Sequence, residues 1–135
     1  MRVFGMVAVL ALAGCVPQQG QDSVASGRAM FMENCAACHG DDAKGDGPLA
    51  ASLAKAPANL TTLAARHGGT FPRDYVMSTI DGYRRGQHFS AAMPQFGEGD
   101  LGPIVMVGNA NGTTTPTPAK LLALADYLQS IQQKP

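Results

Sequence analysis

The stretch CAACH, residues 35–39, places two thiols and an imidazole within one short segment. A CxxCH string is the attachment signature of c-type haem. Each thiol adds across a haem vinyl group to form a thioether, and two cysteines one helical turn apart can reach both vinyl groups. The histidine that follows directs its imidazole at the iron from the same side. The spacing therefore predicts one covalently attached haem c, held by Cys35, Cys38 and His39.

Other uses of a CxxC pair have to be weighed against this one. A thioredoxin-like redox pair is expected between a strand and a helix, whereas here a helical pattern precedes the pair and a Gly/Asp-rich loop follows it. A zinc site needs two further ligands, and His67 and His88 lie much farther apart than the two histidines of a zinc finger. A disulfide between Cys35 and Cys38 would leave His39 without a role.

The first fourteen residues, MRVFGMVAVLALAG, carry one early arginine and then an uncharged run. The run is shorter than the roughly 20 residues of a membrane-spanning helix, which predicts a signal peptide over residues 1–14. Its end, LAGC, resembles the bacterial lipoprotein signal and implies that Cys15 becomes the lipid-modified first residue. An ordinary signal peptide that is cut a few residues later is the alternative. The polar residues 15–22 then predict a flexible tether on the periplasmic side of a bacterial membrane.

Length and charge bound the rest of the chain. With 135 residues in total, a single domain is expected over residues 23–135. Ten basic and ten acidic residues cancel, so the charge gives no support to a nucleic-acid partner.

The apolar spacing predicts the elements that position the motif. A first helix is expected from Ser23 to about Asn34, directly before the motif, and a short helix over residues 60–66. Another helix begins at Pro72 and runs to about residue 81. The segment 83–102 has no period and predicts a long loop, and such loops usually carry function. Residues 104–115 predict a small β-hairpin, and a last helix follows from Thr117 to about Ile131.

With these elements around the motif, the chain resembles class I cytochromes c over about residues 23–131. Gly27 and Phe31 match the family's first-helix glycine and aromatic residue, and Leu124 and Tyr127 match the final-helix pair against which they pack. Glycine lets two helix backbones approach closely, and the aromatic rings fill the sides of the crossing. The resemblance implies an all-α class I cytochrome c fold, with helices wrapped around one haem and a small β-hairpin before the C-terminal helix.

The resemblance also implies a hydrogen-bond partner for the histidine ligand. Pro48 follows His39 at the spacing seen in short bacterial members of the family. There the proline carbonyl accepts a hydrogen bond from Nδ1 of the ligand, which fixes the ring and raises its basicity.

A second axial ligand is expected from a late loop, where the family supplies a methionine. Met77, Met93 and Met106 are the candidates, and Met93 is preferred because it lies in the long loop and is followed by proline, as in the family. His67 and His88 are the rival ligands. A neutral thioether favours ferrous iron, so Met93 implies a higher midpoint potential than a second imidazole would.

Two protein ligands leave no open position at the iron, so the sequence favours an electron carrier over an enzyme. Its expected partners are membrane redox complexes that act as donor and acceptor, together with the membrane itself through Cys15. The alternatives are a haem-containing subunit of a larger oxidoreductase, or a haem enzyme or gas sensor with a labile sixth ligand. The arginines at 66, 73, 84 and 85 form either a basic rim that steers partners or a set of scattered solvated charges.

Overall fold

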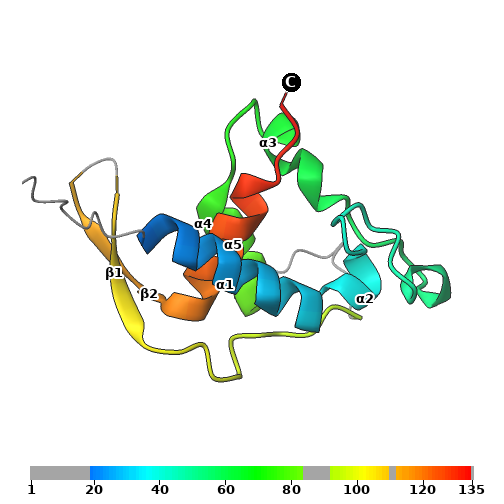
Figure 1. Ribbon diagram of the computed structural model, residues 1–135, viewed down its shortest axis with the longest axis horizontal. Helices are drawn as coiled ribbons and strands as arrows, with labels where there is room; N and C mark the ends of the chain where they lie inside the picture. Colours follow the sequence, from blue (N-terminus) through cyan, green and yellow to red (C-terminus); the bar gives the residue numbers. More distant parts are fainter. Residues whose placement is uncertain (1–18, 84–91, 110–111, 135) are drawn as a thin grey trace, which may run out of the picture.

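The computed structural model describes residues 19–83, 92–109 and 112–134 (Figure 1). The elements of this part are α1 (Gln19–Asn34), α2 (Ala36–His39), η1 (Ala50–Ser52), η2 (Leu60–Thr62), α3 (Leu63–Arg66), α4 (Arg73–Asp81), β1 (Ile104–Gly108), β2 (Thr114–Pro118) and α5 (Ala119–Ser130). The described part is therefore mostly helical with one small antiparallel sheet, as expected from the sequence. No helix in it combines the length and apolar character needed to cross a bilayer.

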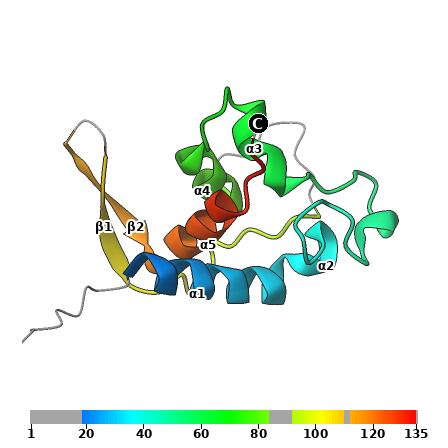
Figure 2. The ribbon, with the colours of Figure 1, turned by 45° about the horizontal axis from the view of Figure 1, so that its top comes forward.

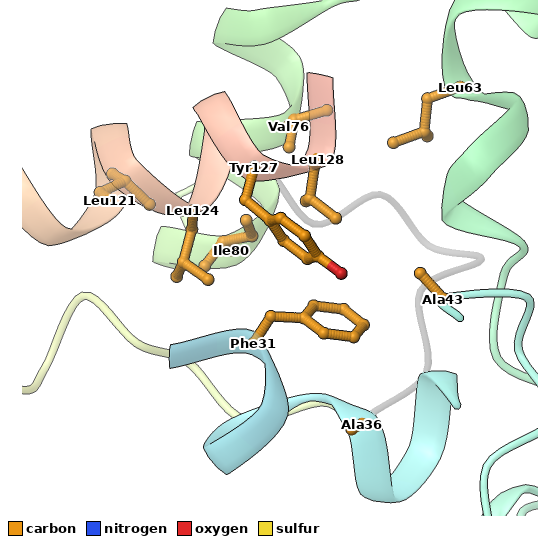
Figure 3. Close-up of a cluster of buried hydrophobic side chains, with 10 residues drawn as sticks. All are labelled: Phe31, Ala36, Ala43, Leu63, Val76, Ile80, Leu121, Leu124, Tyr127 and Leu128. Atoms are coloured by element: carbon orange, nitrogen blue, oxygen red, sulfur yellow. The ribbon is translucent and has the colours of Figure 1, made fainter. Parts of the chain in front are cut away.

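Helices α1 and α5 cross where Gly27 faces α5. A Cβ at Gly27 would lie 1.9 Å from the carbonyl oxygen of Ala123 and 2.9 Å from the Cβ of Tyr127, so no larger residue fits. Beside the crossing, the rings of Phe31 and Tyr127 pack with their centroids 5.3 Å apart and tilted by 51°. Figure 3 shows the two rings facing each other from α1 and α5. The predicted contact between the first and last helices is confirmed.

Helix α4 completes the core against α5. Val76 and Ile80 of α4 are buried, and Figure 3 shows them among the leucines of α5. These buried leucines are Leu121, Leu124 and Leu128. Because they recur at spacings of three and four, they place one apolar stripe of α5 in the core, as the pattern predicted.

A polar network ties the same three helices together. Arg73 at the start of α4 forms a half-buried salt bridge with Asp126 of α5. The hydroxyl of Ser23 on α1 donates to the other oxygen of the Asp126 carboxylate at 2.6 Å. Arg73 also donates to the side-chain oxygen of Gln129, at 2.5 Å. One carboxylate therefore links the beginning of α1 to both α4 and α5.

The helix boundaries follow local signals, with one difference at the start. Helix α1 begins at Gln19, four residues before the predicted start at Ser23, so part of the expected tether is helical. Asp22 in the first turn suits the positive end of the helix dipole. Asn59 caps η2 by accepting the N–H of Thr61 at 2.9 Å. Gly82, in the left-handed conformation at φ 101°, ends α4.

The two strands form a hairpin that projects from the helical body. They pair antiparallel, from Ile104 opposite Pro118 to Gly108 opposite Thr114. The second strand therefore continues through Pro118, which the sequence placed at the start of the last helix. Figure 1 shows the hairpin and α2 at opposite ends of the molecule. Figures 1 and 2 both show the first turn of α1 beside the base of the hairpin.

Candidate functional site

The CxxCH motif occupies the junction between α1 and α2. The N–H of Cys35 donates to the carbonyl of Phe31 at 2.8 Å, and the N–H of His39 donates to that of Cys35 at 2.9 Å. The helical bonding pattern therefore runs through the motif almost without a break. Cys35 and Cys38 are half-buried free thiols one helical turn apart. This is the arrangement that attachment to two vinyl groups requires.

Burial changes the acid–base properties of the motif. Desolvation raises the pKa of the Cys35 thiol to about 11, and the charge of Cys38 adds to the rise. Burial also lowers the pKa of His39, against a smaller opposite effect of its hydrogen bond to Ala58. The neutral imidazole is the form that binds iron, so its burial favours the ligand role.

The loop after His39 folds back onto the motif through backbone hydrogen bonds. The N–H of Gly45 donates to the carbonyl of His39 at 2.7 Å, and that of Gly47 donates to Cys38 at 3.1 Å. These bonds satisfy carbonyls that the end of α2 leaves without a helical partner. A Cβ at Gly47 would lie 2.5 Å from the carbonyl oxygen of Ala36, so the contact depends on glycine. The loop is thus fixed against the motif without any regular secondary structure.

Nδ1 of His39 lies 3.0 Å from the carbonyl oxygen of Ala58. A carbonyl can only accept, so Nδ1 carries the proton and the lone pair for a metal is on Nε2. The sequence assigned this acceptor role to Pro48, and in this structure the assignment is wrong, since Ala58 takes it. The segment that contains Ala58 packs closely on the loop after His39. A Cβ at Gly45 would lie 2.3 Å from the carbonyl oxygen of Pro57, the residue before Ala58.

Ala58 could not be found from spacing, because it comes nineteen residues after His39. The usable signals were the extended, proline-containing KAPAN segment and the cap at Asn59. Asn59 is held by hydrogen bonds to both its side chain and its backbone carbonyl. Its side chain caps η2, and its carbonyl accepts a hydrogen bond from Arg66 at 2.6 Å. This fixes the segment that presents the Ala58 carbonyl to His39.

Met93 is half-buried and packs against the same hydrophobic core as Cys35. The segment after it is fastened to the end of α4, because Phe96 donates to the carbonyl of Ile80 at 3.1 Å and Gly97 donates to that of Asp81 at 2.9 Å. Figures 1 and 2 both show the described segment that begins at residue 92 starting near α2. Ligation by Met93 stays a prediction that this geometry favours.

The competing ligand candidates lie in other surroundings. Met106 is 62% exposed on the hairpin, at the end of the molecule far from α2. Met77 contacts the core from α4 and also lines a hollow between α4, α5 and the hairpin. Nδ1 of His67 lies 2.8 Å from the carbonyl of Leu63, and its ring packs near Tyr75, with 5.5 Å between centroids. His88 lies outside the described residues.

Only part of the predicted basic rim lies within the described residues. Arg66 bonds the carbonyl of Asn59 and Arg73 pairs with Asp126, so both guanidinium groups are engaged within the fold. Arg84 and Arg85 lie outside the described residues, and so does Cys15.

The donor set fits a covalently attached haem. It comprises two thiols one turn apart, an imidazole whose Nε2 lone pair is available, and a methionine packed on the same core. Within the described residues, no group of three or more His, Cys, Asp or Glu side chains converges as a metal-ion site. Cys35 and Cys38 would hold the haem through thioether bonds, and His39 would bind its iron.

Comparison with known proteins gives the same assignment. The sequence profile of the family described as Cytochrome c matches residues 24–132. A 38-residue segment is 53% identical to the cbb3-type cytochrome c oxidase subunit FixP of Bradyrhizobium sp. (strain ORS 278). That segment is 28% of this chain and only 13% of the relative. Because the family match spans both the haem-attachment motif and the crossing of α1 with α5, the chain belongs to the cytochrome c family and carries one covalently bound haem c.

Proposed function

We propose that this cytochrome is a membrane-tethered periplasmic electron carrier whose single haem is ligated by His39 and Met93. The observation that carries the ligand assignment is that Met93 packs on the core that Cys35 also contacts, in a segment that begins near α2 (Figures 1 and 2), whereas Met77 contacts that core from α4. The other late methionines have different surroundings, one on the exposed hairpin and one in the hollow beside it.

The chain's own residues explain why the site moves electrons. When bound, the haem supplies a one-electron exchange at its iron. His39 and Met93 would both bind the iron, which would leave no position for oxygen or peroxide. The hydrogen bond from His39 to Ala58 holds the imidazole in one tautomer and orientation. Ligands that are held in place in both oxidation states keep the reorganisation small, which favours electron exchange over chemical transformation.

Substitution of the methionines tests the sixth ligand. Met93→Ala should abolish the weak long-wavelength absorption of the ferric Met–iron bond and lower the midpoint potential, because the soft thioether that favours ferrous iron is lost. Met77→Ala is the matched control, since it removes a half-buried methionine from the same core and should leave the absorption intact. Loss of the band in Met77→Ala, or its retention in Met93→Ala, would contradict the assignment.

A carrier and a haem enzyme or gas sensor differ in their access to iron. The reduced wild-type protein should not bind carbon monoxide at neutral pH, whereas Met93→Ala should bind it. Rapid carbon monoxide binding by the wild-type protein would favour an enzyme or sensor with a labile sixth ligand.

The tether rests on the LAGC string and on the uncharged run before it. Two or three acyl chains on Cys15 would anchor the protein stably, where a single chain would not. Cys15→Ala should release the holoprotein into the soluble periplasmic fraction. Retention of Cys15→Ala with the membranes would contradict the lipid anchor.

A second candidate is a fixed haem subunit of a membrane oxidoreductase. The observation that favours it is the short match to a subunit of a cbb3-type oxidase. Mild detergent extraction followed by size-exclusion chromatography separates the two candidates. A carrier should elute alone, whereas a subunit should co-elute with its complex in fixed proportion.

A further inference from the structure

The outer face of the β-hairpin is apolar and exposed. Ile104 is 61% exposed and Met106 is 62% exposed, while Val105 and Val107, which alternate with them and point to the other face, are partly buried. The residues opposite them across the ladder, on the same face, are prolines. A sheet face that meets water normally carries polar side chains. This face carries isoleucine, methionine and proline instead.

The segment around this face also lacks charge. No Asp, Glu, Lys or Arg occurs from Leu101 to Ala119, although 15% of the whole chain is charged. The charges that flank this segment in the sequence, Asp100 and Lys120, neutralise each other in a 2.9 Å salt bridge. The hairpin can therefore approach an apolar phase without removing a charge from water.

The chain's connectivity brings this face close to the proposed anchor. Helix α1 begins at Gln19, and the four residues back to Cys15 can span at most roughly 14 Å. The first turns of α1 lie beside the hairpin base (Figures 1 and 2). The contact of Ser23 with Asp126 supports this, since Asp126 and Val107 of β1 line the same hollow. A lipid on Cys15 would hold the bilayer surface near the hairpin.

We propose that the hairpin face formed by Ile104 and Met106 rests on the lipid bilayer surface when the chain is anchored. This inference rests on the lipid anchor of the proposed function. Two apolar side chains would enter the interface while the strand backbones stay at the hydrated headgroup level. A partner strand is a poorer occupant at the β2 edge, because Pro116 and Pro118 have no N–H to offer it.

The orientation that follows has a direct consequence for the haem. Helix α1 has the anchor end at its N-terminus and the CxxCH motif at its C-terminus. Its 16 residues correspond to a length of about 24 Å. With the hairpin on the membrane, the motif lies at the opposite end of the molecule (Figure 1) and is turned away from the lipid.

Hydroxyl-radical labelling read by mass spectrometry tests the contact in the natural holoprotein. The acylated chain in vesicles of phosphatidylethanolamine and phosphatidylglycerol is compared with soluble Cys15→Ala protein. Labelling of Ile104 and Met106 should fall about fivefold on the vesicles, because lipid shields them from water. Tyr75, which is 48% exposed on α4, is the internal control and should not change. Equal labelling of Met106 in both states would overturn the proposal.

The same digest separates this inference from the anchor. An N-terminal peptide without acyl chains would overturn both, whereas an acylated peptide with a fully reactive Met106 would overturn the hairpin contact alone. If Met106 is already protected in the soluble protein and becomes reactive on dilution, the face meets a second copy, and the lipid contact is wrong.

A pair of variants in the anchored chain provides a second readout. Ile104→Ser combined with Met106→Ser should leave membrane retention unchanged but reduce the linear dichroism of the haem band in oriented bilayers, because the domain loses its fixed tilt. Tyr75→Ser is the matched control and should keep the dichroism. Unchanged dichroism in the double variant would contradict an orienting hairpin.

Discussion

The two ends of α1 are built in opposite ways. At the haem end, the loop after His39 has little regular structure, yet it is fastened to the motif by backbone hydrogen bonds and by glycine contacts. At the other end, the hairpin has a regular ladder, yet Ile104 and Met106 on its outer face are 61% and 62% exposed. Regular secondary structure and fixation by tertiary contacts are therefore separate properties in this molecule.

The largest effect on stability is expected from substitution of Gly27, which lies where α1 and α5 cross. Gly27→Ala would put a methyl group 1.9 Å from the Ala123 carbonyl oxygen, so α1 and α5 must separate. We expect a loss of at least about 3 kcal/mol in the free energy of unfolding. Guanidinium denaturation of the holoprotein, followed by circular dichroism, measures it. Gly108→Ala on the hairpin is the matched control, because an added Cβ there meets nothing within 4 Å.

A smaller loss is expected at the haem end alone. Gly47→Ala would place a methyl group 2.5 Å from the carbonyl oxygen of Ala36 and 2.6 Å from that of Ala37, both in the motif. Overpacking against backbone should destabilise the protein by about 2 kcal/mol and lower the yield of attached haem. The pyridine haemochrome spectrum and denaturation measure the two effects. A variant as stable as Gly108→Ala would show that the loop is not fixed as described.

The side chain of Gln132 forms a clamp on the segment that follows Ala58, and its contribution to the free energy of unfolding should be somewhat smaller. The side chain of Gln132 accepts the N–H of Ala64 at 2.9 Å and donates to the carbonyl of Leu60 at 2.8 Å. Gln132→Ala leaves these partly buried backbone groups without the amide and should cost about 1.5 kcal/mol. Gln133→Ala is the control, because only the backbone N–H of Gln133 bonds to Thr61 and that group remains. Equal stability of the two variants would refute the clamp.

The smallest effect is expected on the hairpin face. Ile104→Ser with Met106→Ser should change the unfolding free energy of the soluble Cys15→Ala protein by no more than about 0.5 kcal/mol, because exposed side chains lose few contacts. Thermal denaturation of both soluble forms measures this. A loss comparable to that of Gly47→Ala would mean that the face is packed in solution, and the contrast between the two ends would disappear.

Much of the helical framework was predictable because its signals are local. The apolar spacing of α5, the cap at Asn59 and the stop at Gly82 each act within one or two turns. The start of α1 was predicted too late, because its first turn carries no apolar period. The β2 strand was predicted too short, because a Thr/Pro sequence is as typical of a helix start as of an edge strand.

By itself, the sequence determined the haem chemistry, because covalent attachment needs two cysteines and a histidine at a fixed spacing within one short segment. It also determined the pairing of the first and last helices, because a glycine four residues before an aromatic residue suits a close helix crossing. Only the tertiary structure decided which carbonyl holds His39, since Ala58 reaches it through loop closure past Gly45. The tertiary structure also decided that the hairpin lies beside the first turn of α1. Such contacts join residues distant in the chain, and their geometry depends on how whole segments pack rather than on any local pattern.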